Sequence, residues 1–102
     1  MVVPLAFIGH THFPLVHHGA GTMATIDAGD TIRIQPGEKY IINVGSVGQP
    51  RDGDPRAAYM IFDDEERRVS LFRVDYDVDL TARKILDAGL PEMLADRIRR
   101  GY

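Results

Sequence analysis

Two histidines separated by a single residue are the part of this sequence best suited to chemistry. His10 and His12 follow a short apolar segment and belong to Gly9-His10-Thr11-His12. In an extended backbone, residues two positions apart point to the same side, with Cα atoms about 6.5 Å apart, because the rise is roughly 3.3 Å per residue. Dinuclear hydrolases hold two ions about 3.5–4 Å apart, so each imidazole could bind one of them. By spacing alone, polar loop residues without a ligand are the commoner case.

A second candidate site lies in a loop dense in glycine and proline, from residue 45 to residue 55. Arg51 and Arg56 could grip a phosphate through bidentate guanidinium contacts. They could equally pair with the neighbouring carboxylates of Asp52 and Asp54. The sequence leaves these two interpretations even.

The start of the same loop could face a site through its backbone. Gly45, Ser46 and Gly48 could present N–H groups or a hydroxyl to a bound anion, although turn geometry explains them at least as well. We therefore keep Gly45, Ser46 and Arg51 as candidate substrate-binding residues.

Two other polar clusters favour structural roles. The adjacent His17 and His18 would face opposite ways on a strand, which favours an exposed strand or loop edge over a metal site. Asp75, Asp77 and Asp79 alternate with apolar residues, and this alternation predicts the solvated face of a strand.

Composition limits the classes of protein to which the chain can belong. Its 102 residues carry 12 Lys+Arg against 15 Asp+Glu, a net charge of −3, and 44% are hydrophobic, which predicts one globular domain over residues 1–102. No basic run favours nucleic acid or an anionic membrane as a partner. The absence of cysteine excludes disulfides, thiolate catalysis and cysteine-ligated zinc. Because the N-terminal apolar stretch has no basic leader, we expect a cytoplasmic protein.

The strands that must hold these residues follow from the apolar pattern. Wholly apolar segments predict strands buried on both faces, and segments separated by turn-forming or charged residues predict hairpins. Buried strands are expected at Leu5 to Ile8 and Tyr40 to Val44. One hairpin is expected from Thr22 to Ile26 with Thr31 to Ile34, and another from Ala57 to Phe62 with Val69 to Val74.

The last quarter of the chain predicts two helices. The first has Asp79 as its N-cap and Gly89 as its stop signal. Pro91 fits the first position of the second helix, which Gly101 ends. The apolar faces are formed by Ala82, Ile85 and Leu86 in the first helix, and by Leu90, Leu94 and Ile98 in the second.

The two loops together resemble a known family. Gly9-His10-Thr11-His12 is similar to the last signature of the calcineurin-like metallophosphoesterases, and residues 43–56 are similar to a loop of their small prokaryotic members. The resemblance extends over essentially all 102 residues. It implies an α/β fold, α+β by content in this segment. That fold would be the C-terminal part of a four-layer α/β/β/α sandwich, with mostly antiparallel strands and hairpins followed by two C-terminal helices.

For the site, the resemblance implies that His10 binds one metal ion and His12 the other. Members of the family cleave phosphomonoesters or phosphodiesters with two divalent ions, here Mn, Fe, Ni or Zn. The signatures that supply the bridging carboxylate, the other ligands and the acid precede this motif in the family. Only nine residues precede His10, and no histidine follows His18. We therefore expect the C-terminal half of a phosphoesterase, with its N-terminal metal-binding half absent and little activity of its own.

Two further expectations follow from the missing half. Two imidazoles without carboxylates should bind Zn, Ni or Cu weakly. Apolar faces left open should lead the chain to form a homo-oligomer or to pair with the missing half. The alternative function is a non-catalytic, β-rich metal-binding or subunit-association module.

Overall fold

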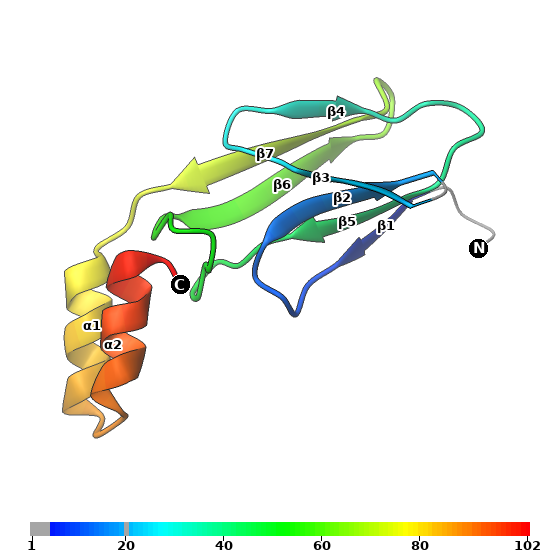
Figure 1. Ribbon diagram of the computed structural model, residues 1–102. Helices are drawn as coiled ribbons and strands as arrows, with labels where there is room; N and C mark the ends of the chain where they lie inside the picture. The colour runs from blue at the N-terminus through cyan, green and yellow to red at the C-terminus, as the bar shows by residue number, and fades with distance from the viewer. Residues whose placement is uncertain (1–4, 20) are drawn as a thin grey trace.

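The computed structural model describes residues 5–19 and 21–102, and in these residues strands precede two helices (Figure 1). The strands are β1 (Leu5–Ile8), β2 (Pro14–His18), β3 (Thr22–Thr25), β4 (Thr31–Arg33), β5 (Tyr40–Val44), β6 (Ala57–Asp63) and β7 (Arg68–Val74). The helices are α1 (Val78–Asp87) and α2 (Glu92–Arg100).

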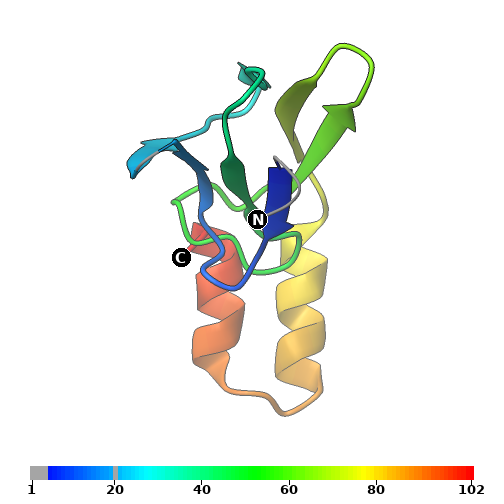
Figure 2. The ribbon, with the colours of Figure 1, turned by 90° about the vertical axis from the view of Figure 1, so that its right-hand side faces the viewer.

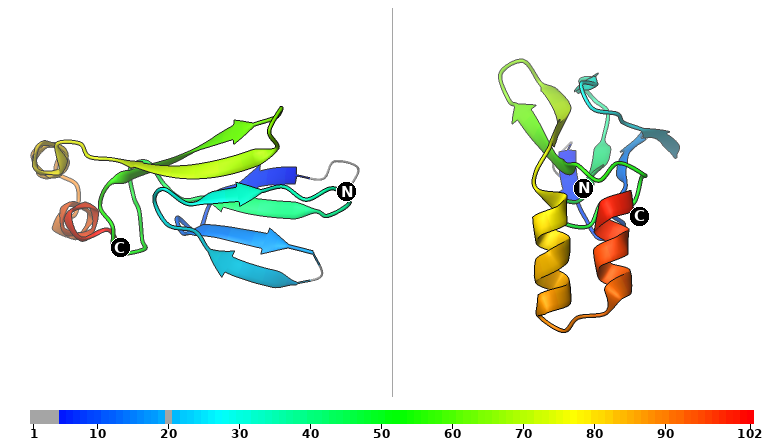
Figure 3. Two further views of the ribbon diagram at one scale, coloured as in Figure 1. Left: turned by 90° about the horizontal axis from the view of Figure 1, so that it is seen from above. Right: turned by 90° about the vertical axis from the view of Figure 1, so that its left-hand side faces the viewer.

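The strands form two sheets that face each other (Figure 3). One sheet has the strand order β1-β5-β2-β3, and the other has the order β4-β7-β6. β1 and β5 are parallel, whereas the other pairs are antiparallel. The predicted class, an α+β arrangement of mostly antiparallel strands followed by two helices, is confirmed.

The space between the two sheets holds the main hydrophobic core. Val16 and Ile42 lie opposite each other in the first sheet and are 5% and 0% exposed. In β7, Val69 and Leu71 are fully buried, and because they are two positions apart they share one face of the strand. The remaining buried members of this core are Ile26, Ile34, Tyr40 and Ala58.

The hairpin predicted from residues 22–26 and 31–34 is wrong. The turn between the two segments forms, since the N–H of Asp30 donates to the carbonyl of Asp27 at 3.0 Å. However, β3 pairs with β2, and β4 pairs with β7 of the other sheet. The chain crosses between the sheets here, which lets apolar residues on both sides of the turn enter the core. Turn residues specify a reversal but not the strand that will be paired.

β1 is less buried than predicted. Phe7 and Ile8 are 42% and 46% exposed, because within the described residues β1 is paired on its β5 side only. β5 is mostly buried, as predicted, apart from Ile41, which is 41% exposed. β6 is an edge of the other sheet, and the ring of Phe62 lies 6.1 Å from that of Phe7. The sandwich is therefore open along the side formed by β1 and β6.

The segment after Gly9 contains a strand that was not predicted. β2 lies between β5 and β3, and Pro14 is its first residue. Proline is tolerated at the start of a strand because it has no N–H to give to the ladder. The histidine loop is therefore short and joins two strands that are both hydrogen-bonded to β5.

α1 begins earlier than predicted, with Asp77 as its N-cap. The Asp77 carboxylate accepts a hydrogen bond from the N–H of Leu80 at 3.0 Å. The strand face predicted for Asp75, Asp77 and Asp79 is therefore wrong, since Asp79 lies in the first turn of the helix. α2 follows Pro91 directly and ends at Gly101, as predicted to within one residue.

The helices pack on each other rather than on a sheet. They enclose a separate cluster of Ala82, Ala95 and Ile98, and Figure 2 shows them side by side below the strands. In the described part of the chain, neither helix is both long and apolar enough to cross a membrane.

The loop between β5 and β6 attaches the helices to the sandwich. The N–H of Gly53 donates to the carbonyl of Gly101 at 2.8 Å. Arg73, whose side chain is 3% exposed, pairs with Asp52 and donates to the carbonyl of Arg56 at 2.9 Å. The resulting molecule is elongated, with extents of 50 × 23 × 20 Å and a radius of gyration of 15.7 Å. A compact domain of 100 residues has a radius of gyration of about 13 Å.

The contact at Gly101 predicts a difference between two helix-ending glycines. Both Gly89 and Gly101 have positive φ, at 76° and 81°. A Cβ at Gly101 would lie 2.7 Å from backbone atoms of Asp54, whereas a Cβ at Gly89 would meet nothing within 4 Å. We expect Gly89→Ala to lower the free energy of unfolding by about 1–2 kcal/mol and Gly101→Ala by about 3 kcal/mol or more. Urea unfolding measures both variants, and equal losses would contradict this account of the junction.

Candidate functional site

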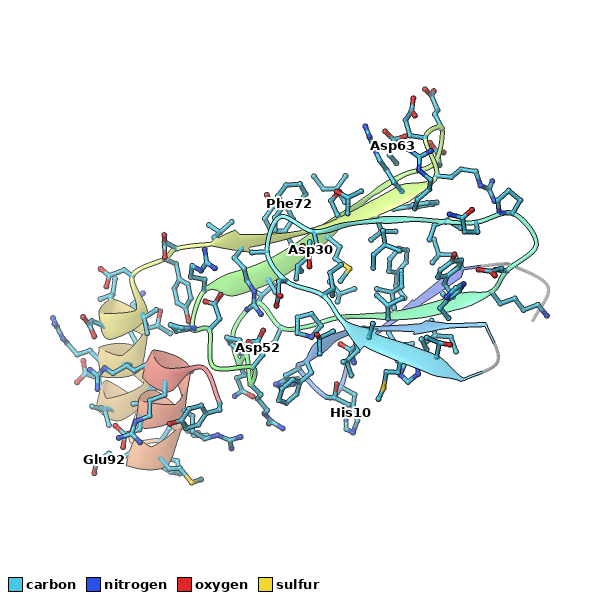
Figure 4. All side chains as sticks on the ribbon, turned by 45° about the horizontal axis from the view of Figure 1, so that its top comes forward. His10, Asp30, Asp52, Asp63, Phe72 and Glu92 are labelled. Carbon is cyan, nitrogen blue, oxygen red and sulfur yellow. The ribbon has the colours of Figure 1, made fainter. Side chains whose placement is uncertain are left out.

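The two predicted metal ligands lie on the loop between β1 and β2, at the end of the sandwich that carries the helices (Figure 1). Figure 4 shows His10 on the outside of this loop. Both histidines have positive φ, 86° for His10 and 65° for His12. This backbone region costs a residue with a side chain about 1–2 kcal/mol. The loop is thus not the extended segment assumed from the spacing, and its conformation must be held by other contacts.

The imidazole of His12 is held by the loop that follows β5. Its Nδ1 lies 2.7 Å from the carbonyl oxygen of Gln49. Since a carbonyl oxygen only accepts hydrogen bonds, Nδ1 must carry the proton and donate it. The N–H of Arg51 also donates to the carbonyl of His12 at 3.4 Å. The neutral ring therefore presents an unprotonated Nε2, which is the atom that can bind a metal ion.

A buried amide links the same two loops from below. Asn43, in β5, is 2% exposed. Its Nδ2 donates to the carbonyl of Gly9 at 3.0 Å and to Oγ1 of Thr11 at 2.8 Å. Its Oδ1 accepts from the N–H of Gly45 at 3.0 Å. Neither Asn43 nor Gln49 was identified from the sequence as part of a site. An asparagine inside an apolar strand was a usable signal, whereas nothing in the sequence singles out a backbone carbonyl.

The first two residues of the β5–β6 loop have the contacts of a tight turn. Gly45 has a φ of 87°, and a Cβ there would lie 3.0 Å from the Pro14 ring. Oγ of Ser46 accepts from the N–H of Gln49 at 2.9 Å, and the Ser46 carbonyl accepts from the N–H of Ala58 at 3.0 Å. The turn interpretation therefore explains both residues without a bound anion.

The two loop arginines have different surroundings. Arg56 pairs with Asp54, with Nη2 and Oδ2 2.7 Å apart, and this pairing is the main cause that lowers the pKa of Asp54. Arg51 instead lies beside the His12 loop, and its buried Nε has no partner among the described residues. A cavity of about 10 Å³, room for about one water molecule, lies next to it. Besides Arg51, the residues that line it are Gln49, Pro50, Leu94, Arg97, Ile98 and Tyr102.

The exposed position predicted for the second histidine pair holds for His17 only, because β2 is an inner strand of its sheet and His18 is half-buried. His17 is exposed on β2, whereas His18 faces the opposite way and stacks on the ring of Tyr40 at 4.6 Å. His18 also pairs with Glu38, and this hydrogen bond is the main cause that lowers the pKa of that carboxyl.

The described residues hold no group of three or more His, Cys, Asp or Glu side chains able to bind a metal ion together. The loop can offer two imidazoles, and the engaged Nδ1 of His12 fits the role of a metal ligand held by its other nitrogen. A dinuclear site of the predicted kind would need carboxylates as well, and within residues 5–19 and 21–102 no cluster brings them to the two histidines.

Comparisons with known proteins give two clear relatives. The chain is 40% identical over 97 residues to the uncharacterized protein MJ0912 of Methanocaldococcus jannaschii, a match that covers 95% of this chain and 39% of that protein. It is also 40% identical to a metallophosphoesterase from Sphaerobacter thermophilus, whose crystal structure matches all of this chain with a TM-score of 0.92. That match covers 44% of the Sphaerobacter chain. No family model matches the sequence. The chain thus spans less than half the length of the relatives it matches, and the predicted resemblance is confirmed.

Proposed function

We propose that this chain, which belongs to the calcineurin-like metallophosphoesterases, supplies two histidine ligands to a dinuclear site that hydrolyses phosphate esters. The observation that carries the proposal is the hydrogen bond from Nδ1 of His12 to the carbonyl of Gln49. It leaves Nε2 free in a fixed direction, which is how ligand histidines are usually oriented. Two divalent ions bound there would activate a water molecule and orient the phosphoryl oxygens.

In this proposal the chain provides part of the site and the rest of a longer protein completes it. His10 binds one ion and His12 the other, with Mn, Fe, Ni or Zn as the metals. The β5–β6 loop faces the phosphate, with Arg51 as the charged contact and with Gly45 and Ser46 beside it. The location of the loop supports this role, since Gln49 and Arg51 both bond to the His12 segment.

The same proposal assigns a partner to the open side of the sandwich. β1 and β6 each leave one edge without a partner strand in the described residues. Phe7, Ile8, Ile61 and Phe62 on these strands are 42–54% exposed. Unpaired strand edges with apolar side chains favour pairing with further strands. We propose that the remaining part of the longer protein covers this side, and that a second copy of the chain covers it when that part is absent.

The metal proposal predicts weak, selective binding by the chain alone. Two imidazoles favour Zn, Ni and Cu over Mg, because nitrogen ligands follow the Irving–Williams order. A calorimetric titration should show weak Zn²⁺ binding that becomes weaker in His10→Ala and in His12→Ala. His17→Ala, which removes an exposed histidine on β2, should leave the affinity unchanged. Tight Mg²⁺ binding, or Zn²⁺ binding unaffected by His10→Ala, would contradict the proposal.

The proposed division of the site predicts where activity resides. With Mn²⁺, the 102-residue chain should show almost no turnover of an aryl phosphodiester, because its described residues hold no cluster of three or more metal-binding side chains that could complete a dinuclear site. A longer protein that contains this chain should hydrolyse the ester and lose at least about a hundredfold in rate in His12→Ala, since even a residue that supports a metal ligand is worth 10–100-fold. Metal-dependent turnover by the short chain that disappears in its own His12→Ala variant would overturn the proposed division.

The open side predicts self-association of the chain. Light scattering at micromolar concentration should detect a dimer or larger species, and Phe62→Lys should shift it toward the monomer by placing a charge at the β6 edge. Leu86→Lys is the matched control, since Leu86 is 43% exposed on α1, away from this side. A stable monomer that binds no hydrophobic dye would contradict the prediction.

A further inference from the structure

We propose that Asn43 is the positioning residue that holds the His10–His12 loop in its metal-binding conformation. The metal-binding purpose of this conformation rests on the proposed function, whereas the effect of Asn43 on the loop can be measured in the metal-free chain. It is based on the position of the buried Asn43 amide directly beneath a loop in which His10 and His12 both have positive φ.

The side chain of Asn43 is shielded from water, since the residue is only 2% exposed. An amide buried without partners loses its hydrogen bonds to water, so each of its groups needs a partner in the protein. The two Nδ2 hydrogens go to Gly9 and Thr11, and Oδ1 accepts from Gly45. The amide is thus committed to the two loops of the candidate site.

The backbone of the histidine loop is strained at both His10 and His12. Positive φ is rare for residues other than glycine, and the loop contains two such residues on either side of Thr11. Strained residues of this kind persist only where the surrounding structure over-determines them. The hydrogen bonds from Asn43 reach the residue before His10 and the residue between the two histidines. They therefore fix the backbone on both sides of the first strained position.

Contacts through Thr11 and Gly45 connect Asn43 to the second histidine, His12. Oγ1 of Thr11 accepts from Asn43 and also from the N–H of Phe13 at 3.4 Å, so it spans the residue between them. His12 then meets the carbonyl of Gln49 with Nδ1. Because Asn43 also binds Gly45, at the start of the loop that carries Gln49, one amide sets the relative position of the donor and the acceptor.

This role differs from that of an ordinary core amide in what it controls. A purely structural amide would affect only the stability of the fold. A positioning amide sets which nitrogen of His12 carries the proton, because that choice depends on the hydrogen bond to Gln49. The tautomer of His12 is therefore a measure of the positioning itself.

The experiment measures the tautomers of His12 and of the exposed His17 in the metal-free chain by long-range ¹H–¹⁵N NMR of the imidazole rings. In the unmodified chain, His12 should be mainly protonated at Nδ1, whereas His17 should have the Nε2–H form that a free imidazole prefers. Asn43→Ala and Thr11→Val should both shift His12 toward the His17 pattern. Thr11→Ser keeps the hydroxyl and should retain the Nδ1–H form.

The two Thr11 variants keep the test decisive even if Asn43→Ala does not fold. Zn²⁺ affinity, measured on the same samples, should fall about tenfold in Thr11→Val and remain unchanged in Thr11→Ser. If His12 keeps its Nδ1–H form in folded Thr11→Val, the positioning role is wrong. If the tautomer shifts as expected but Zn²⁺ does not perturb His10 or His12 in the unmodified chain, the positioning role stands and the proposed function fails.

Discussion

The buried amide of Asn43 needs hydrogen-bond partners inside the protein, and this need determines the conformation of the loops at the end of the sandwich that carries the histidines. A buried amide has three or four hydrogen bonds to make, and here they reach the β1–β2 loop and the β5–β6 loop at once. The β1–β2 loop joins two strands that both pair with β5, and the β5–β6 loop begins at the end of β5. The sheet therefore fixes the distance between the two loops. The amide then fixes their conformations.

This end of the sandwich connects to the helices on one side and to the open edges of the two sheets on the other. Toward the helices, the β5–β6 loop continues into the ion pairs of Arg73 with Asp52 and Asp54, and into the close contact with Gly101. Away from the helices, the sandwich core is closed between the sheets but open along β1 and β6. The ordered loop and the open side fit our proposal that further strands of a longer protein cover β1 and β6.

Patterns that depend on neighbouring residues predicted much of this structure. The apolar runs predicted β1 and β5, and the charged residues between two apolar segments predicted the β6–β7 hairpin. Gly101 predicted the end of α2. The sequence did not give pairings between distant segments. The turn at residues 27–30 is real, yet its flanking strands belong to different sheets, because β7 offers the hydrogen bonds that β4 uses. Likewise, the alternation of polar and apolar residues from Asp75 to Asp79 is typical of a strand, but in the structure Asp77 is the N-cap of α1.

In the candidate site, too, local patterns could be predicted from the sequence, whereas contacts between distant residues could not. The residue types and the family resemblance predicted His10 and His12 as metal ligands, and this assignment stays a prediction. The extended geometry expected for them was wrong, since both have positive φ. The partner of Nδ1 is a backbone carbonyl 37 residues away, a relation that no local pattern encodes. Asn43 was visible as a polar residue within an apolar strand, but its role depends on three contacts that only the fold brings together.

In our proposal, His12 binds a metal ion through Nε2 while its Nδ1 keeps the hydrogen bond to the carbonyl of Gln49. A crystal structure of a longer protein that contains this chain, grown with Zn²⁺ and phased on the anomalous signal, measures both contacts directly. The account predicts an ion about 2.0–2.1 Å from Nε2 of His12 with the Nδ1 hydrogen bond intact. An ion bound through Nδ1, or ions held entirely by residues outside the His10–His12 loop, would contradict it.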